Sequence, residues 1–119
     1  MRYSRQRQAI YETLKGTKSH PDAEWVYEQV RREIPDISLG TVYRNLKQLS
    51  DSGDILTVET MDKSVHFDAD TSPHMHFVCS ECGCIKDLFM DSGMLARLRE
   101  MGYGARTEKA VYYGVCNNC

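Results

Sequence analysis

The sequence has no apolar run approaching the roughly 20 residues that a membrane-spanning helix needs. Its first residues, which include Arg2, Arg5 and Arg7, lack the apolar core of a secretory signal. It also contains no internal repeat or low-complexity segment. These absences argue against a membrane span, a secreted chain and a repeat protein. We therefore expect a cytoplasmic protein with no membrane partner.

Strong charge of one sign is also missing. The 119 residues include 15 Lys and Arg against 17 Asp and Glu, a net charge of −2, with 41% hydrophobic residues. This balance is ordinary for one globular domain or two small ones. It would count against a nucleic-acid partner if the charges were evenly spread, but they are not. The first 20 residues carry, against Glu12 alone, the basic residues Arg2, Arg5, Arg7, Lys15 and Lys18.

Acidic residues are absent from positions 38–50. This stretch predicts a helix over 39–50, capped by Ser38 and followed by a helix-ending Gly53. Its buried face would carry Leu39, Val42, Leu46 and Leu49. At about 100° per residue, Arg44 lies opposite that face, beside small, polar and basic residues. These neighbours are Gly40, Thr41, Lys47 and Gln48.

Two further helices and a hairpin surround this helix. Ser4 caps a helix that buries Ile10 and Leu14 and ends near Gly16, and His20-Pro21 then interrupts the chain. Asp22 caps a helix whose apolar stripe continues to Ile34, before Pro35 ends it. Strands are expected over 55–60 and 64–67. Three helices and a hairpin describe a winged helix-turn-helix or, equally, a small α+β domain with a solvated third helix. The acid-free basic face favours DNA binding.

The second half predicts strands over 74–79, 84–89 and 110–115 and a helix over 91–101. The expected fold class is therefore α+β, with a winged-helix domain over 1–69, a hinge over 70–73, and a small α/β domain over 74–119. A domain of about 46 residues usually needs a metal, disulfides or a partner subunit for stability.

Cysteine is absent before residue 79, and the five cysteines then follow as Cys79, Cys82, Cys84, Cys116 and Cys119. In a reducing compartment, two C-x-x-C pairs predict a metal site. Four thiolates around zinc form a closed, structural site. Cys79, Cys82 and Cys84 could exchange as ligands, and we favour Cys82 because its spacing matches the C-terminal pair. Buried thiols or a redox dithiol are the alternatives.

A second set of metal-ligand residues is less specific: His20, Asp68, His74, His76 and Asp87. His74 and His76 lie two residues apart on an expected strand, so both imidazoles face one side. Mixed imidazole and carboxylate ligands suit Fe(II), Mn(II) or Zn(II), and a site with an open position suits Fe(II) best. Any one of these histidines taken alone is more often an ordinary surface or core residue. His66 is interpreted as such a residue.

Taken together, these motifs resemble the ferric uptake regulator (Fur) family of bacterial metal-dependent repressors, and within it the peroxide-sensing (PerR) branch. The resemblance covers nearly the whole chain in order. It rests on residues 20–23, residues 38–46, Phe67-Asp68, His74 to Gly83, Asp87, and residues 113–119.

The resemblance implies a winged helix followed by a dimerisation domain. It implies a structural zinc on Cys79, Cys82, Cys116 and Cys119. It also implies a regulatory Fe(II) or Mn(II) held by His20, Asp68, His74, His76 and Asp87, which would tie the two domains into a DNA-competent homodimer. The DNA partner would be a palindromic operator contacted by the third helix. Its candidate contacts are Thr41, Tyr43, Arg44 and Lys47.

The resemblance to the peroxide-sensing branch depends mainly on Asp68. Aspartate at this position resembles the peroxide sensors, whereas glutamate there resembles the iron sensors. In the peroxide branch, bound Fe(II) reacts with peroxide and a ligand histidine gains oxygen; the matching positions are His20 and His74. This reaction is sacrificial, so we do not expect an enzyme. The alternatives are a Fur-like sensor of iron or another divalent metal without peroxide chemistry and, more remotely, a four-cysteine redox or electron-transfer module.

Overall fold

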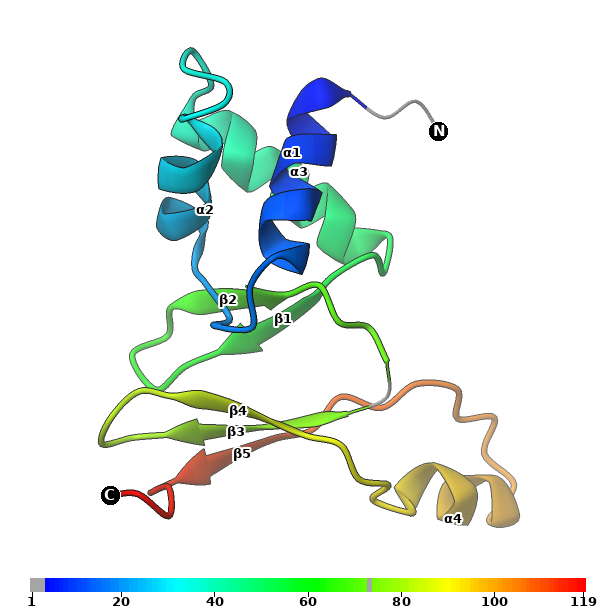
Figure 1. Cartoon of the computed structure of the whole chain (residues 1–119). Coiled ribbons are helices and arrows are strands. Elements are labelled where there is room, and N and C mark those ends of the chain that lie inside the picture. The colour runs from blue at the N-terminus through cyan, green and yellow to red at the C-terminus, as the bar shows by residue number, and fades with distance from the viewer. Residues whose placement is uncertain (1–3, 73) are drawn as a thin grey trace. The chain divides into compact units, whose positions relative to one another are not determined.

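The computed structural model describes residues 4–72 and 74–119 (Figure 1). Residues 1–3 of the expected DNA-binding domain and residue 73 of the expected hinge lie outside the described residues. The chain forms two compact units, Met1–Thr71 and Ser72–Cys119, and its mixture of helices and strands confirms the α+β class. Within the described residues, no helix is both long and apolar enough to span a bilayer.

The first unit contains three helices followed by a two-stranded hairpin. The helices are α1 (Arg5–Lys15), α2 (Ala23–Val30) and α3 (Leu39–Asp51). Strands β1 (Leu56–Glu59) and β2 (Val65–Asp68) pair antiparallel. This order of elements confirms the predicted winged helix-turn-helix.

Each helix of this unit begins at its predicted cap. A side-chain oxygen at the cap accepts a hydrogen bond from a backbone N–H three residues later, which satisfies one of the unpaired donors of the first turn. The pairs are Ser4 with Arg7 (3.1 Å), Asp22 with Trp25 (2.9 Å) and Ser38 with Thr41 (3.1 Å).

The end of α3 also follows the sequence. Gly53 has a φ of 82°, a left-handed conformation that glycine adopts without steric cost. The N–H of Asp54 donates to the carbonyl of Leu49 (2.9 Å), and the N–H of Gly53 donates to that of Ser50 (3.1 Å). These two bonds are the Schellman arrangement that satisfies the last carbonyls of a helix.

Helix α2 is shorter than predicted. It ends at Val30, although its apolar stripe suggested a helix reaching Ile34. Ile34 is still buried, and its N–H donates to the carbonyl of Val30 (2.9 Å), but it lies in a bend beyond the helix. Pro35 explains part of this difference, because the residue before a proline is disfavoured in the α conformation.

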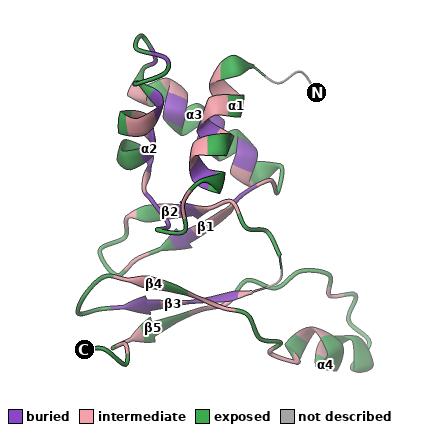
Figure 2. Ribbon diagram, in the orientation of Figure 1, coloured by how far each residue is buried: buried purple, intermediate pink, exposed green. Residues whose placement is uncertain are grey.

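The core of the first unit is assembled from all of its helices and from the hairpin. Figure 2 shows the buried segments of α1, α2 and α3 in purple. The cluster comprises Ile10, Leu14, Ala23, Val26, Val30, Ile34, Ile37, Val42, Leu46, Leu49, Ile55 and Phe67. The packing holds α3 with one face inward and leaves its other face exposed.

The second unit is a three-stranded sheet and one helix. Strands β3 (Met75–Cys79), β4 (Ile85–Leu88) and β5 (Val111–Gly114) lie in the order β4-β3-β5. β3 is antiparallel to β4 and parallel to β5. Helix α4 (Met94–Glu100) connects β4 to β5.

Helix α4 begins at Met94, three residues later than predicted. Gly93 precedes it with a φ of 76°, and this left-handed residue cannot continue a right-handed helix from Asp91. α4 buries no residue, and the buried residues described in this unit, Met75, His76, Val78 and Cys79, all lie on β3. The second unit therefore has a thin core.

Candidate metal centres and nucleic-acid interface

The exposed face of α3 is polar and basic. Tyr43, Arg44 and Lys47 are exposed, and Thr41 is half-buried. The guanidinium of Arg44 donates to the hydroxyl of Thr41 (3.1 Å), which steadies the arginine on the helix surface. Lys47 forms an ion pair with Asp51 (3.0 Å), the last residue of α3 and the first acidic residue after the acid-free stretch. Of the cations on this face, Arg44 is therefore the one whose positive charge is least neutralised by a neighbouring carboxylate.

A buried asparagine lies beneath this surface. Asn45 belongs to the inward face of α3, where the sequence pattern indicated only apolar residues. Its amide donates to the carbonyl of Thr41 (2.9 Å), and its side-chain oxygen accepts from Arg7 of α1 (3.4 Å). These bonds satisfy a polar group that would otherwise be costly to bury.

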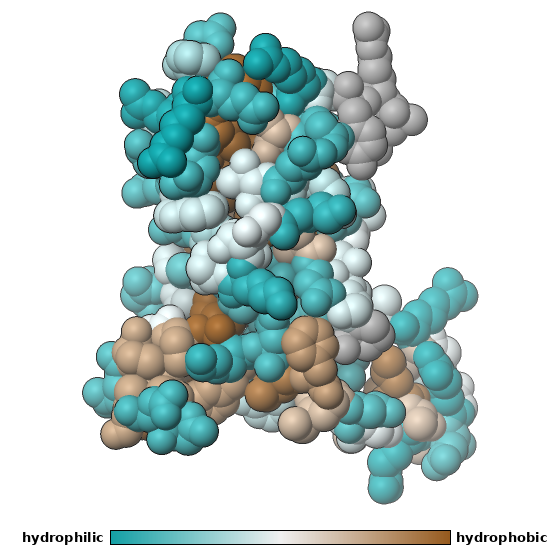
Figure 3. All heavy atoms as spheres, viewed as in Figure 1, coloured by the Kyte–Doolittle hydropathy of each residue, from teal (hydrophilic) through white to brown (hydrophobic). Residues whose placement is uncertain are grey.

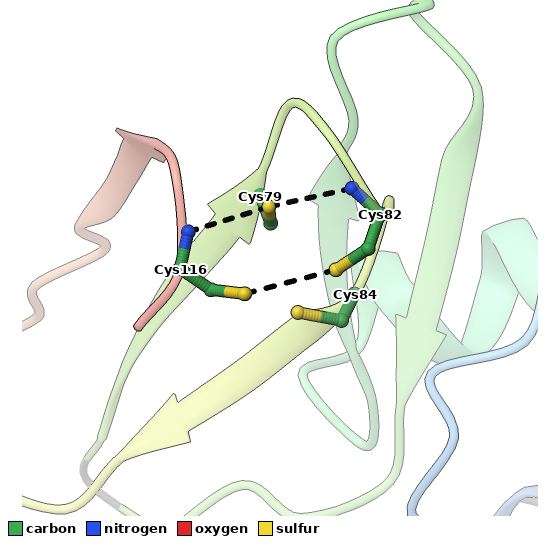
Figure 4. A group of neighbouring side chains, drawn as sticks. All are labelled: Cys79, Cys82, Cys84 and Cys116. Atoms are coloured by element: carbon green, nitrogen blue, oxygen red, sulfur yellow. Dashed lines mark hydrogen bonds between the residues drawn. The ribbon is translucent and has the colours of Figure 1, made fainter. Parts of the chain in front are cut away.

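The five cysteines lie together at one end of the second sheet. Cys79 ends β3, a tight turn follows, and Cys84 directly precedes β4. The parallel register pairs Cys79 with Gly114 of β5, which brings Cys116 beside the turn. Figure 4 shows the sulfurs of Cys79, Cys82, Cys84 and Cys116 converging.

The sulfur separations match the size of a zinc ion. Sγ of Cys79 lies 3.8 Å from Sγ of Cys119, and Sγ of Cys82 lies 3.8 Å from Sγ of Cys116. Four sulfurs about 2.3 Å from a central zinc in a tetrahedron lie about 3.8 Å from one another. A disulfide needs sulfurs about 2.05 Å apart, so these pairs are thiols at metal-ligand spacing. The donor set fits zinc.

Backbone amides prepare Cys79 for a metal. Its sulfur accepts from the N–H groups of Cys116 (3.3 Å), Cys82 (3.4 Å) and Glu81 (3.4 Å). These bonds, those from Cys82 and Cys116 above all, lower the pKa of Cys79 from 9.0 to about 6. Zinc binds thiolates, so the folded turn presents one ligand already in its binding form near neutral pH.

Cys84 belongs to the same cluster. The sulfurs of Cys79, Cys82, Cys84 and Cys116 all lie within 4.8 Å of one another, a group that contains Cys84 rather than Cys119. Hydrogen bonding to Cys82 raises the pKa of Cys84 to about 11, and hydrogen bonding to Cys116 raises that of Cys119 to about 12. The sulfurs of Cys116 and Cys119 are 3.4 Å apart. The structure thus brings together all four predicted zinc ligands and the fifth cysteine.

The second unit also brings three of the predicted nitrogen and oxygen donors together. His76 lies directly opposite Asp87 in the antiparallel pairing of β3 and β4, and His74 precedes His76 by two residues on the same face. Nε2 of His76 lies 3.3 Å from Oδ1 of Asp87, and Nε2 of His74 lies 3.4 Å from the same oxygen. The two Nε2 atoms are 3.1 Å apart.

The first unit holds the other two predicted donors. The backbone around Asp22 forms a bridge with His66 of β2, and the N–H of Phe67 donates to the carbonyl of Pro21 (2.9 Å). This pairing lays the segment after α1 along β2. Nε2 of His20 consequently lies 3.3 Å from Oδ2 of Asp68, and both side chains are nearly buried.

These distances fit a metal bound by nitrogen and oxygen. Donors about 2.1 Å from one ion lie about 3.0–3.4 Å from each other in octahedral or tetrahedral geometry. The separations within each unit, 3.3 Å in the first and 3.1–3.4 Å in the second, lie in this range. Imidazole with carboxylate suits Fe(II), Mn(II) or Zn(II).

His66 contacts a predicted metal-ligand residue, a role that the sequence pattern did not suggest. Its Nδ1 lies 2.6 Å from the carbonyl oxygen of His20, and its Nε2 lies 3.0 Å from the hydroxyl of Ser64. His20 has a φ of 55°, an uncommon conformation for a residue other than glycine. The contact with His66 supports this conformation. A usable signal was present, since His66 and Asp68 are two residues apart on one strand and so share a face.

Comparisons with known proteins match nearly the whole chain. The model of the ferric uptake regulator family matches residues 1–112. The peroxide-responsive repressor PerR of Staphylococcus aureus is 32% identical over an alignment covering all of this chain and 82% of the relative.

Two solved structures show the same fold. The Campylobacter jejuni peroxide stress regulator has a TM-score of 0.81 and 28% identity, covering 96% of this chain and 88% of the other. The ferric uptake regulator of Pseudomonas aeruginosa with manganese has a TM-score of 0.80 and 28% identity, covering 98% and 91%.

Proposed function

Because the chain belongs to the ferric uptake regulator family, we propose that this metalloregulator represses transcription as a DNA-bound homodimer and senses peroxide. The observation that carries the proposal is the set of nitrogen and oxygen donors at metal-ligand spacing, His20 with Asp68 and His74 with His76 and Asp87. These donors occur in the same chain as a winged helix with an exposed basic face. A DNA-binding repressor acts in the cytoplasm, where the five thiols stay reduced.

The DNA contacts are assigned to α3. In winged-helix and related folds this helix enters the major groove, and a dimer reads two half-sites of a palindromic operator. Arg44 is suited to a base or phosphate contact because it is exposed and presents several donors. Lys47, Thr41 and Tyr43 complete the proposed contact surface, and contacts to phosphates make the affinity salt-dependent.

The homodimer is assigned to the second unit. Its core is thin, and many of its large hydrophobic side chains are exposed, as the hydropathy colouring of Figure 3 illustrates. The exposed residues are Phe89, Met90, Met94, Met101, Tyr103, Tyr112, Tyr113 and Val115, each 47–69% exposed. A second copy of the chain packed against this surface would bury apolar side chains that so small a unit cannot bury alone.

The proposed regulatory metal is Fe(II) or Mn(II) held by all five donors. The first unit contributes one imidazole and one carboxylate, and the second contributes two imidazoles and one carboxylate, so neither supplies five alone. An ion that needs ligands from both units favours one arrangement of the DNA-binding unit over others. Metal and DNA binding are then coupled, and each strengthens the other by the same factor. Zinc on the four paired cysteines has no open position and serves structure only.

Peroxide sensing is supported by Asp68 and by the names of the similar proteins. When bound, Fe(II) would supply the redox chemistry that lets peroxide attack a ligand. In that reaction, one oxygen of hydrogen peroxide would add to a ring carbon of His20 or His74, and the other oxygen would leave as water. An oxidised imidazole is a weaker ligand, so the site loses its metal and the repressor releases DNA. The chain is consumed rather than turned over, so it is not an enzyme.

The test is mass spectrometry of protein loaded with Fe(II) or Mn(II) and exposed to peroxide. We expect a peptide containing His20 or His74 to gain the mass of one oxygen atom in the Fe(II) sample and no gain in the Mn(II) sample. The matched variant Asp68→Glu should keep metal-dependent DNA binding and lose most of the gain. If the Fe(II) sample gains no oxygen, the protein senses a divalent metal by reversible binding alone.

A further inference from the structure

The zinc cluster contains one more sulfur than zinc can bind. Zinc in a structural site takes four ligands, and five cysteines lie at this end of the sheet. Sγ of Cys119 lies 3.8 Å from Sγ of Cys79, and Sγ of Cys84 lies within 4.8 Å of the sulfurs of Cys79, Cys82 and Cys116. Two complete sets of four are therefore available, which share three members and differ only in whether Cys84 or Cys119 is the fourth.

The two candidate fourth ligands are held differently. Cys84 directly precedes β4, and its carbonyl accepts a hydrogen bond from the N–H of Cys79 (3.0 Å), which holds its backbone beside β3. Cys119 lies beyond β5, is exposed, and is positioned by the bond from its N–H to the carbonyl of Cys116 (3.2 Å). Figure 4 shows the side chain of Cys84 directed toward the sulfurs of Cys82 and Cys116. Cys84 could therefore bind a metal ion between the sulfurs of Cys82 and Cys116 without any change in the hydrogen bonds between the strands.

We propose that Cys84 is an alternative fourth ligand of this zinc. It exchanges with Cys119, while Cys79, Cys82 and Cys116 remain bound. The proposal rests on the zinc site proposed above. Its consequence is that one thiol is always unbound next to the metal, and that the unit keeps its zinc when either alternative ligand is lost.

Cysteine-to-serine variants of the full chain test the exchange through zinc content and affinity. Cys84→Ser and Cys119→Ser should each keep one zinc per chain, with affinity within about tenfold of the parent protein. The double variant should lose more than about 100-fold, because even partners outside the ligand set cost about 10–100-fold when removed. Cys79→Ser combined with Cys84→Ser, which also leaves three cysteines and removes a shared ligand, is the matched control and should lose as much as the Cys84→Ser and Cys119→Ser double variant.

Two results would overturn the exchange: loss of zinc from Cys119→Ser equal to that from the matched control with three cysteines, or full zinc retention by the Cys84→Ser and Cys119→Ser double variant. A parent protein that purifies without zinc would instead refute the zinc site itself, so the two failures are distinguishable.

A measurement on the unmutated protein tests the exchange even if the variants fail to fold. Brief alkylation of the zinc-loaded chain with iodoacetamide should label about one cysteine per chain, divided between Cys84 and Cys119. Label on Cys84 alone, or on Cys119 alone, would show a fixed ligand set and overturn the exchange.

Discussion

At the scale of the residue, the support that His66 gives to His20 links the hairpin to the proposed regulatory metal. His20 holds a left-handed backbone conformation, which for a non-glycine residue costs of the order of 1–3 kcal/mol unless its surroundings impose it. The imidazole of His66 contacts the carbonyl of His20 at 2.6 Å. We therefore propose that His66 is a positioning residue that orients His20, one of the proposed ligands.

We predict that His66→Ala weakens regulatory metal binding by about tenfold, since residues that orient a ligand typically contribute 10–100-fold in affinity. Titration with Mn(II), followed by the ion's electron spin resonance signal, measures this effect. Val65→Thr, an exposed change on the same strand, is the control and should leave the affinity unchanged. Equal affinities for His66→Ala and the parent would remove His66 from this role.

Residue types and spacing predicted both sets of metal-ligand residues, but not the pairings within them. The Cys-x-x-Cys pairs and His74-x-His76 follow from local spacing, because two residues on a turn or strand face are close in any fold. The contact of His20 with Asp68 depends on the segment after α1 lying along β2. That pairing joins residues 46 positions apart, at His20 and His66, and a local pattern carries no information about it.

At the scale of the element, α3 combines the best-predicted packing with the proposed DNA surface. Its cap, its glycine end and the buried Val42, Leu46 and Leu49 were predicted, because each depends on residues within one or two turns. Leu39, predicted on the same buried face, is only half-buried at the start of the helix. The burial of Asn45 was not predicted, since its partner Arg7 belongs to α1. The ends of α2 and α4 differed because local backbone effects at Pro35 and Gly93 outweighed the apolar periodicity.

Arg44 allows the surface of α3 to be tested without disturbing its core. Arg44→Ala should weaken operator binding by about 1–3 kcal/mol and reduce its salt dependence, because an exposed cation that contacts DNA is lost. Zinc content and dimerisation should stay unchanged. Glu24→Ala, on α2 and also exposed, is a control for altering charge elsewhere on the unit. Fluorescence anisotropy at several salt concentrations measures both quantities, and unchanged affinity would exclude Arg44 from the interface.

At the scale of the whole molecule, the two units depend on different sources of stability. The first has a hydrophobic core built from three helices and a hairpin, whereas the buried residues described in the second all lie on β3. The sequence indicated this contrast, because a segment of about 46 residues with two Cys-x-x-Cys pairs is typical of a metal-stabilised unit.

Removing zinc should therefore affect the units unequally. With a strong chelator under reducing conditions, we predict that amides of β3, β4 and β5 lose hydrogen-exchange protection, while those of α1, α2 and α3 keep it. Restoring excess zinc should restore the protection. Exchange in β3 that does not change after zinc has left would show that the sheet is stable without the metal.

Operator binding by the metal-loaded homodimer, measured before and after peroxide, tests whether this protein is a metal-dependent, peroxide-sensing repressor. Duplexes selected from a random pool by the Mn(II)-loaded protein provide the operator. We expect tight binding with Fe(II) or Mn(II), weak binding without either metal, and loss of binding after peroxide with Fe(II) alone. Binding that is independent of the metal, or that survives peroxide equally with both metals, would contradict this expectation.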